Sequence, residues 1–455
     1  MLSAQAPPSK VPPADSLTRA LQLARAHQYS EAEAAIRGVA PPAARQQRIA
    51  YFRLKAAIAS GLGRTSDAAG YLETACKLAP ENLDLQIASG LARLQAQLEN
   101  RIDPGATLKS LRSTPLPPEG ELELRLRLAE LLSSSGRFEE AAADLAVASR
   151  RAPDRSDILF NLALAQFRVG QLDAALASAE RAKQLQNSGS LESLVGDIQE
   201  QSGDSLAAVH SYQAAVALEP SEERHRLALA IELLRHQTFD AAIVVLDQSA
   251  QLFPQSVRVR ILQGLAYYLV DRSSEAVRAL LEATRLGPND ETTARYLGEI
   301  SLQDSASPDP AAAAQLCKFA DEHPKNNTAG AFCGGVLLRL ARENEDVSRK
   351  PEILLRLRRA VLEAPAEPVA RCQAAKAFEW AEQWQRARIQ MEECVRLDPD
   401  SPEGHYRLSR IYRQLGLADL AGQQTLLQQQ AAQRQSDESL RRTKTVTKFL
   451  VLLDR

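Results

Sequence analysis

Histidines, cysteines and paired carboxylates are the residues of this sequence that could carry out catalysis or bind a metal. His225 and His236 share one predicted helix, but eleven residues of helix place them about 16 Å apart, too far to share a metal ion. The neighbouring acids Glu139 and Glu140 are typical of a solvated helix face. The sequence contains no zinc-protease, P-loop or nucleophile-elbow motif. We therefore predict that the protein is not an enzyme and has no cofactor and no metal site.

The cysteines give no sign of a disulfide framework. Their number is odd and no two are spaced as C-x-x-C; they are Cys76, Cys317, Cys333, Cys372 and Cys394. Neither a set of disulfides nor a zinc site is indicated by this pattern. We expect each cysteine to be a small buried apolar residue.

Composition and charge are those of an ordinary water-soluble protein. Of the 455 residues, 45% are hydrophobic and 25% charged, and the formal net charge is −2. A net charge so close to zero gives no overall field to attract nucleic acid or an anionic membrane surface. No run of 18 apolar residues exists, so we predict no membrane span.

A fixed period organises the middle of the chain. Pro220, Pro254 and Pro288 are 34 residues apart. Small and bulky positions keep the same step, in the sets Gly196, Ala230, Gly264; Ala208, Ala242, Ala276; and Tyr212, Leu246, Leu280. Two helices of about 13 residues with two short turns come to roughly 34 residues. Proline ends the second helix of each pair, because it lacks an N–H and clashes with the preceding turn.

This order of small, bulky and proline positions resembles the tetratricopeptide repeat family. The resemblance covers almost the whole chain as about twelve helical pairs. Eight of these pairs close at Pro153, Asn187, Pro220, Pro254, Pro288, Pro324, Pro365 and Pro399. It implies an all-α fold, an α-solenoid in which helix–turn–helix repeats stack into a right-handed superhelix.

The repeats divide the chain into three parts. Residues 1–14 are Pro-rich and are expected to be disordered, residues 15–434 form the repeat array, and residues 435–455 form a C-terminal cap and tail. Within the array we expect a degraded unit near 82–118 and turn insertions near 303–311 and 344–351. The pattern of 443–455 does not choose between helix and strand.

Two locations remain open. Ala4 and Ala6 match the small-x-small pattern of a secretory cleavage site, but no basic and apolar region precedes them. By default the protein is soluble and cytoplasmic. If the true start lies upstream of Met1, it is exported or periplasmic.

The resemblance implies that the first helix of each unit lines the concave side of the solenoid. Projected in this way, the predicted partner-binding residues are Phe160, Leu164, Phe167, Arg224, Leu227, Ile231, Leu234, Arg258, Ile261, Leu265 and Tyr268. We expect Ile231 and Leu265 to be partly in water until a partner covers them. The alternative is that many of these side chains pack between helices. Nearer the C terminus the same face is expected to be basic, with Arg407, Arg410 and Arg413.

The carboxylate clamp by which some members of this family bind chaperone tails is not present. Asn161 matches in one unit, but Ser190, Leu194 and Asp197 occupy the next. We therefore expect a non-catalytic scaffold that binds a peptide or helix of a partner protein on its concave face. One alternative is an exported assembly or adaptor protein of the bacterial envelope. A second alternative is a regulatory subunit of an enzyme encoded elsewhere.

Overall fold

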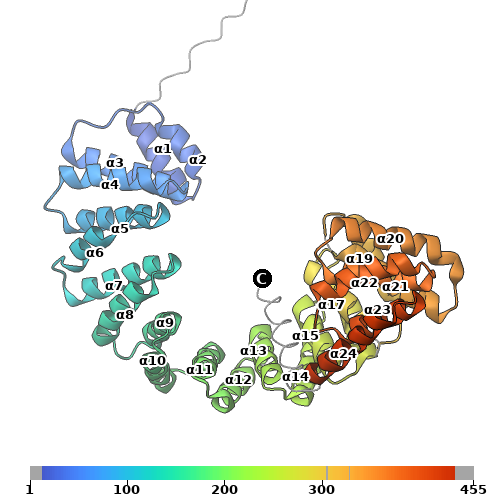
Figure 1. Ribbon diagram of the computed structural model, residues 1–455. Helices are drawn as coiled ribbons and strands as arrows, with labels where there is room; N and C mark the ends of the chain where they lie inside the picture. The colour runs from blue at the N-terminus through green and yellow to red at the C-terminus, as the bar shows by residue number, and fades with distance from the viewer. Residues whose placement is uncertain (1–12, 304–305, 327, 436–455) are drawn as a thin grey trace, which may run out of the picture. The chain divides into compact units, whose positions relative to one another are not determined.

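The computed structural model describes residues 13–303, 306–326 and 328–435. Within these residues it contains 24 α-helices, one short 3-10 helix and no strand. Successive helices pack as antiparallel hairpins, so the fold is an all-α helical repeat solenoid (Figure 1). The chain divides into two compact units, an N-terminal unit that ends at Asn187 and a C-terminal unit that begins at Ser188.

The N-terminal unit consists of five hairpins that stack in chain order (Figure 1). Its helices are α1 (Pro13–Arg25), α2 (Tyr29–Ile36), α3 (Arg45–Gly61), α4 (Thr65–Leu78), α5 (Leu83–Glu99), α6 (Gly105–Arg112), α7 (Pro118–Ser134), α8 (Phe138–Arg151), α9 (Ser156–Arg168) and α10 (Leu172–Leu185). In three of the hairpins the second helix has 14 residues, but α2 and α6 have only eight.

The C-terminal unit begins with three regular hairpins and continues through a less regular middle part. Its helices are α11 (Gly189–Ser202), α12 (Ser205–Leu218), α13 (Glu223–Arg235), α14 (Phe239–Leu252), α15 (Val257–Leu269), α16 (Ser273–Leu286), α17 (Glu291–Ser301), α18 (Pro310–Glu322), α19 (Ala329–Glu343), η1 (Val347–Arg349), α20 (Lys350–Glu363), α21 (Pro368–Trp380), α22 (Trp384–Leu397), α23 (Pro402–Gln414) and α24 (Ala418–Gln435). Helix α19 packs against α17, α18, α20 and α21, and every residue from Ala331 to Leu338 is buried. It is therefore the centre of this part of the unit.

Most of the turns inside the hairpins contain one residue with a left-handed backbone. Gly136 and Gly170 have φ values of 78° and 76° at the turns that follow α7 and α9. Glycine adopts this conformation without the steric cost that a Cβ would add. Asp271 takes the same role after α15, with a φ of 60°.

Small residues allow the two helices of a hairpin to approach closely. A Cβ added at Gly196 in α11 would lie 2.7 Å from Cε1 of Tyr212 in α12. At Gly264 in α15 it would lie 2.8 Å from Cγ of Leu280 in α16. The repeating small and bulky positions of the sequence are therefore partners across each hairpin.

The short helix α6 is held by a buried ion pair. The Asp144 side chain in α8 is 0% exposed and accepts hydrogen bonds from two guanidinium groups. Arg112, at the end of α6, donates from Nη2 at 2.7 Å, and Arg125 in α7 donates from Nη1 at 2.7 Å. A buried carboxylate needs such partners, because an unpaired charge in the interior is costly.

Four of the five cysteines form two disulfides, so the expectation of free apolar cysteines is wrong for them. Cys317 in α18 is bonded to Cys333 in α19, and Cys372 in α21 to Cys394 in α22, with Cα–Cα distances of 4.7 and 5.0 Å. Cys76 is free. The two cysteines of each bonded pair lie at similar sequence distances before and after the turn that joins their helices. Antiparallel helices bring such positions face to face. The sequence prediction considered only the odd number of cysteines and the C-x-x-C spacing, and so it missed this pairing.

Two expectations from the sequence concern parts that lie outside the described residues. These are the Pro-rich lead-in up to residue 12 and the C-terminal tail from residue 436. Both stay predictions.

Candidate functional site

A pocket opens between the first helices of two neighbouring hairpins of the N-terminal unit. It has a volume of about 420 Å³ and receives side chains from α7, α8 and α9. Its lining residues are Leu126, Ala129, Glu130, Ser133, Phe138, Leu145, Arg155, Asp157, Asn161, Leu164 and Ala165. Leu126 and Leu164 are partly exposed, so both are open to an apolar group that enters the pocket.

Polar groups lie beside Leu126 and Leu164 in this pocket. Arg155 donates a hydrogen bond from Nε to Oδ1 of Asp157 at 3.0 Å. This hydrogen bond lowers the pKa of the Asp157 carboxyl, which burial alone would raise. The exposed side chain of Asn161 can both donate and accept a hydrogen bond, as a peptide backbone requires. The pocket thus combines apolar contact with groups that can orient a bound chain.

The predicted residues of α9 reach the surface, whereas half of those on α13 and α15 are buried. Phe160, Leu164 and Phe167 are all half-buried, and Leu164 lines the pocket described above. By contrast, four of the predicted apolar residues in the C-terminal unit are buried: Leu227 (6% exposed), Leu234 (0%), Ile261 (3%) and Leu265 (1%). These four belong to the hydrophobic core of that unit. The expectation that Leu265 is partly in water is therefore wrong.

Ile231 and Tyr268 are half-buried and pack against the same core. The two predicted arginines beside these residues remain at the surface. Arg224 is exposed, donates a hydrogen bond to Oγ of Ser190 and lies 3.8 Å from Glu222. Arg258 is exposed as well. In the C-terminal unit, the apolar surface left for a partner is much smaller than the sequence suggests.

Two of the three arginines on the face of α23 that was expected to be basic are paired with acids. Arg407 contacts Glu379 at 3.0 Å and Glu403 at 2.7 Å. Arg410 contacts Glu379 at 3.2 Å, and Arg413 donates to Ser409 at 3.0 Å. Burial would raise the pKa of Glu403, but Lys376 and Arg407 together lower it. Arg407 and Arg410 therefore belong to an ion-pair network, whereas Arg413 contacts only the hydroxyl of Ser409.

Comparison with known proteins agrees with the repeat geometry. A family model described as tetratricopeptide repeat matches residues 126–190 and 196–257, which include α9, α13 and the pocket between α7 and α9. Residues 126–190 and 196–257 are therefore tetratricopeptide repeats. No curated protein sequence matches the chain.

Several solved tetratricopeptide structures resemble parts of the chain at low identity. YrrB, described as a TPR protein with an unusual peptide-binding site, is 19% identical, with 39% of this chain and 91% of YrrB covered and a TM-score of 0.33. The C-terminal part of a TPR repeat-containing protein from Cytophaga hutchinsonii is 16% identical, with 62% and 99% covered and a TM-score of 0.45. The Cut9–Hcn1 assembly of APC/C is 14% identical, with 88% and 84% covered and a TM-score of 0.34.

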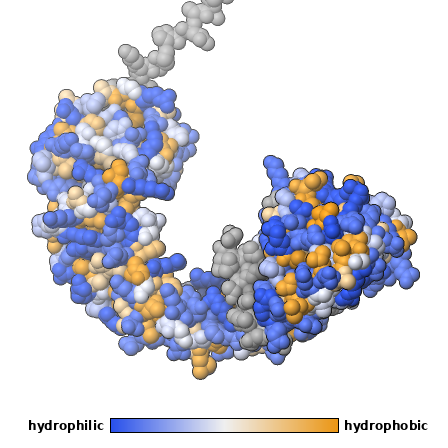
Figure 2. All heavy atoms as spheres, in the orientation of Figure 1, coloured by the Kyte–Doolittle hydropathy of each residue, from blue (hydrophilic) through white to orange (hydrophobic). Residues whose placement is uncertain are grey.

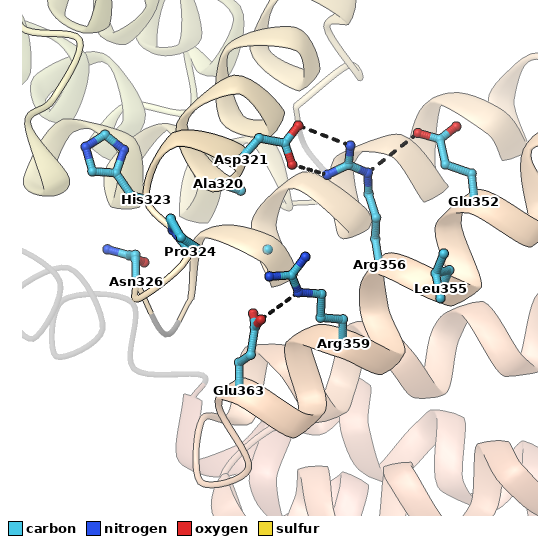
Figure 3. A pocket seen from close by; sticks show the side chains of 11 residues that line it. Ala320, Asp321, His323, Pro324, Asn326, Glu352, Leu355, Arg356, Arg359 and Glu363 are labelled. Atoms are coloured by element: carbon cyan, nitrogen blue, oxygen red, sulfur yellow. Dashed lines mark hydrogen bonds and ion pairs between the residues drawn. The ribbon is translucent and has the colours of Figure 1, made fainter.

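A second pocket lies between α18 and α20 and has a volume of about 370 Å³ (Figure 3). Figure 3 shows Arg356 extending between Asp321 and Glu352, at 2.9 and 3.6 Å. Arg359 reaches Glu363 at 2.6 Å. The hydrogen bond from Arg356 lowers the pKa of Asp321. Because both arginines of this pocket are already paired with carboxylates, the pocket offers an anion little.

Two further possibilities for the described residues are a metal site and a membrane-spanning helix. Figure 2 shows hydrophobic and hydrophilic side chains interspersed on the visible face of each unit. Among the described residues, no group of three or more His, Cys, Asp or Glu side chains is placed to hold a metal ion. None of the described helices is both long and apolar enough to cross a membrane.

The sequence prediction missed the half of the α7–α9 pocket that α7 provides. Leu126, Glu130 and Ser133 stand one period of 34 residues before Phe160, Leu164 and Phe167. The same projection applied one repeat earlier would have found them. Phe138 and Leu145 come from the second helix of the hairpin, which the projection leaves out.

Proposed function

We propose that the protein is a non-catalytic scaffold that binds a peptide segment of a partner protein in the pocket between α7 and α9. The observation that supports this proposal is the combination of partly exposed Leu126 and Leu164 with the polar group of Asn161 in one pocket of about 420 Å³. A pocket of this size admits one large apolar side chain of a peptide and leaves the peptide backbone at the rim.

The contributions to binding can be ranked. Covering a leucine or phenylalanine side chain is worth about 1.5–3 kcal/mol, which makes the apolar contact at Leu164 the main source of affinity. A hydrogen bond from Asn161 to the peptide backbone adds about 0.5–1.5 kcal/mol and fixes orientation. The Arg155–Asp157 pair lies at the exposed rim and contributes little.

A peptide library tests the proposal without knowledge of the partner. Dodecapeptides displayed on phage are selected on the full-length protein, and selected peptides are measured by fluorescence anisotropy. We expect Leu164→Asp to weaken binding at least tenfold and Asn161→Ala to weaken it a few-fold. Leu206→Asp is the matched control, because Leu206 is 71% exposed on α12 and lines none of these pockets.

Two results would contradict the proposal. One is a library from which no peptide is enriched. The other is a set of peptides that bind Leu164→Asp as tightly as the unchanged protein. Circular dichroism of each variant checks that the loss of binding does not come from unfolding.

A second candidate function is that of an adaptor protein that acts after export. The disulfides Cys317–Cys333 and Cys372–Cys394 support this candidate, because disulfides persist in oxidising compartments and are rare in the cytosol. Each crosslinks two neighbouring helices of the C-terminal unit, where it limits the freedom of the unfolded chain.

Thiol labelling of the protein in its native cells tests this candidate. Cells are lysed directly into a denaturing buffer that contains an alkylating reagent and no reductant, so that the buried thiols of Cys333 and Cys394 can also react, and the labelled cysteines are identified by mass spectrometry. Export predicts that only Cys76, which is partly exposed, is alkylated without prior reduction. Labelling of all five cysteines would instead indicate a reducing compartment.

A further inference from the structure

The N-terminal unit contains another pocket, beside the end of the short helix α2. Helix α2 ends at Ile36 after eight residues, whereas α4, α8 and α10 each have 14. The chain then passes through Arg37, Gly38 and Val39. A pocket of about 500 Å³ remains between this segment and α3.

The walls of the pocket are held in place by specific contacts. Tyr51 of α3 is 6% exposed and donates a hydrogen bond from its hydroxyl to the Val39 carbonyl oxygen at 2.8 Å. Arg48 donates to the carbonyl oxygens of Pro42 and Ala43 at 2.9 and 3.0 Å. The segment that replaces the end of α2 is therefore tied to α3, and Ile36 and Ile58 line the pocket beneath it.

Lys55 brings a positive charge into this pocket. Its Nζ lies 4.2 Å from the ring centroid of Tyr71 and 5.8 Å from that of Tyr51. An aromatic ring attracts an ammonium group, but it is not a strong hydrogen-bond acceptor. The three N–H donors of Lys55 therefore remain available to a ligand. No carboxylate of the described residues lies within ion-pair distance of Lys55.

The remaining charges of the pocket also favour an anion. Arg64 is paired with Glu33, whereas Arg37 is exposed and has no carboxylate partner among the described residues. With Lys55, the lining carries three cations and one carboxylate. This contrasts with the pocket between α18 and α20, in which Arg356 and Arg359 are both neutralised.

We propose that the pocket between α2 and α3 binds the carboxylate of an acidic peptide segment, with Lys55 as its main contact and Arg37 as a second cation. The segment that precedes α1 does not supply a side-chain carboxylate, because the only charged side chain of residues 1–12 is that of Lys10. The site is separate from the pocket between α7 and α9, so either can be lost without the other.

The test uses the full-length protein and fluorescein-labelled heptapeptides of alternating leucine and glutamate. One peptide ends in a free carboxyl group and one in an amide, and a third replaces glutamate by lysine. Both acidic peptides are expected to bind and to weaken as salt is added, whereas the lysine peptide does not bind. Weaker binding of the amidated peptide identifies a chain-terminal carboxylate as the ligand, and equal binding identifies a side-chain carboxylate.

Variants locate the site. We expect Lys55→Met to weaken binding of the acidic peptides at least tenfold and Lys55→Arg to retain most of it. Arg53→Met is the matched control, because Arg53 is an exposed cation two residues away on the opposite side of α3. Lys55→Met binding within twofold of the unchanged protein, or equal binding of the lysine peptide, would overturn the proposal. Leu164→Asp should leave this binding unchanged, which separates the site from the proposed partner pocket.

Discussion

Helices α9 and α15 are both the first helix of their repeat, yet their equivalent apolar side chains differ in exposure. On α9, Phe160, Leu164 and Phe167 are half-buried, and Leu164 lines a pocket. On α15, Ile261 and Leu265 are 3% and 1% exposed and belong to the core. An apolar residue at an inner position of a repeat can therefore form either a binding surface or the interior.

The neighbouring helix explains how the α9 surface arises. On α7, one repeat earlier, the positions of Leu164 and Phe167 are taken by Glu130 and Ser133. These polar side chains need water, so the space beside α9 remains open. The binding capacity of an inner face thus depends on two successive helices together.

The largest expected effect comes from the same substitution at the two leucines. We expect Leu265→Ser to lower the free energy of unfolding by about 2–5 kcal/mol, since it removes a buried side chain and buries a hydroxyl. Leu164→Ser should cost less than about 1 kcal/mol, because water already reaches that side chain. Urea unfolding measures both. Because repeats unfold in parts, hydrogen exchange of residues 257–286 should confirm where the loss occurs.

Equal destabilisation by the two substitutions would show that α9 and α15 are packed alike and would remove the basis of the comparison. Leu206→Ser is the control, as its exposed side chain should leave stability unchanged.

A smaller effect is expected at the turns that follow the two helices. Gly170, after α9, has a φ of 76°, and Asp271, after α15, has a φ of 60°. Gly170→Ala should therefore lower stability by about 1 kcal/mol, because its Cβ crowds the left-handed backbone. Asp271→Ala should cost less, since the Asp271 backbone already bears that strain. Thermal unfolding of each variant gives the comparison, and a greater loss at Asp271 would contradict it.

The smallest effects are titrations on opposite sides of neutral pH. Beside α9, the hydrogen bond from Arg155 lowers the pKa of Asp157, so its stabilisation is present above the unfolded value of about 3.9 and is lost as pH falls through the folded value. On α15, burial and the hydrogen bond to Asp247 raise the pKa of Tyr267. Its contribution is present below about pH 10 and is lost as pH rises further.

Two measurements check these signs. Carbon-13 NMR of the Asp157 carboxyl should show a midpoint below that of a free aspartate, and Asp157→Asn identifies the signal. The absorbance change at 295 nm that disappears in Tyr267→Phe should have a midpoint above that of free tyrosine. A midpoint at the ordinary value in either case would mean that the corresponding hydrogen bond is absent in solution.

The repeat architecture could be predicted from the sequence because its determinants are local and periodic. The 34-residue steps of proline, and of pairs such as Gly196 with Tyr212, set the hairpins directly. The exposure of Leu265 could not be predicted in this way, because it depends on what packs across from it. The pairing of Cys372 with Cys394 becomes visible only when the hairpin is placed first. The pocket at Lys55 lies where α2 is shorter than the second helices of most other repeats. Comparison of equivalent repeat positions does not reveal such a shortened helix.

The two disulfides also limit how far the chain can be stretched. The bonded cysteines enclose separations of 16 and 22 residues, and each bond ties the ends of its segment to within 5.0 Å. At about 3.5 Å per extended residue, roughly 120 Å of contour length is withheld from a molecule pulled at both ends. In a single-molecule pulling experiment, added reductant should release this hidden length in two unequal steps. The hairpins α18–α19 and α21–α22 would thus limit the length to which the oxidised chain can be extended by force.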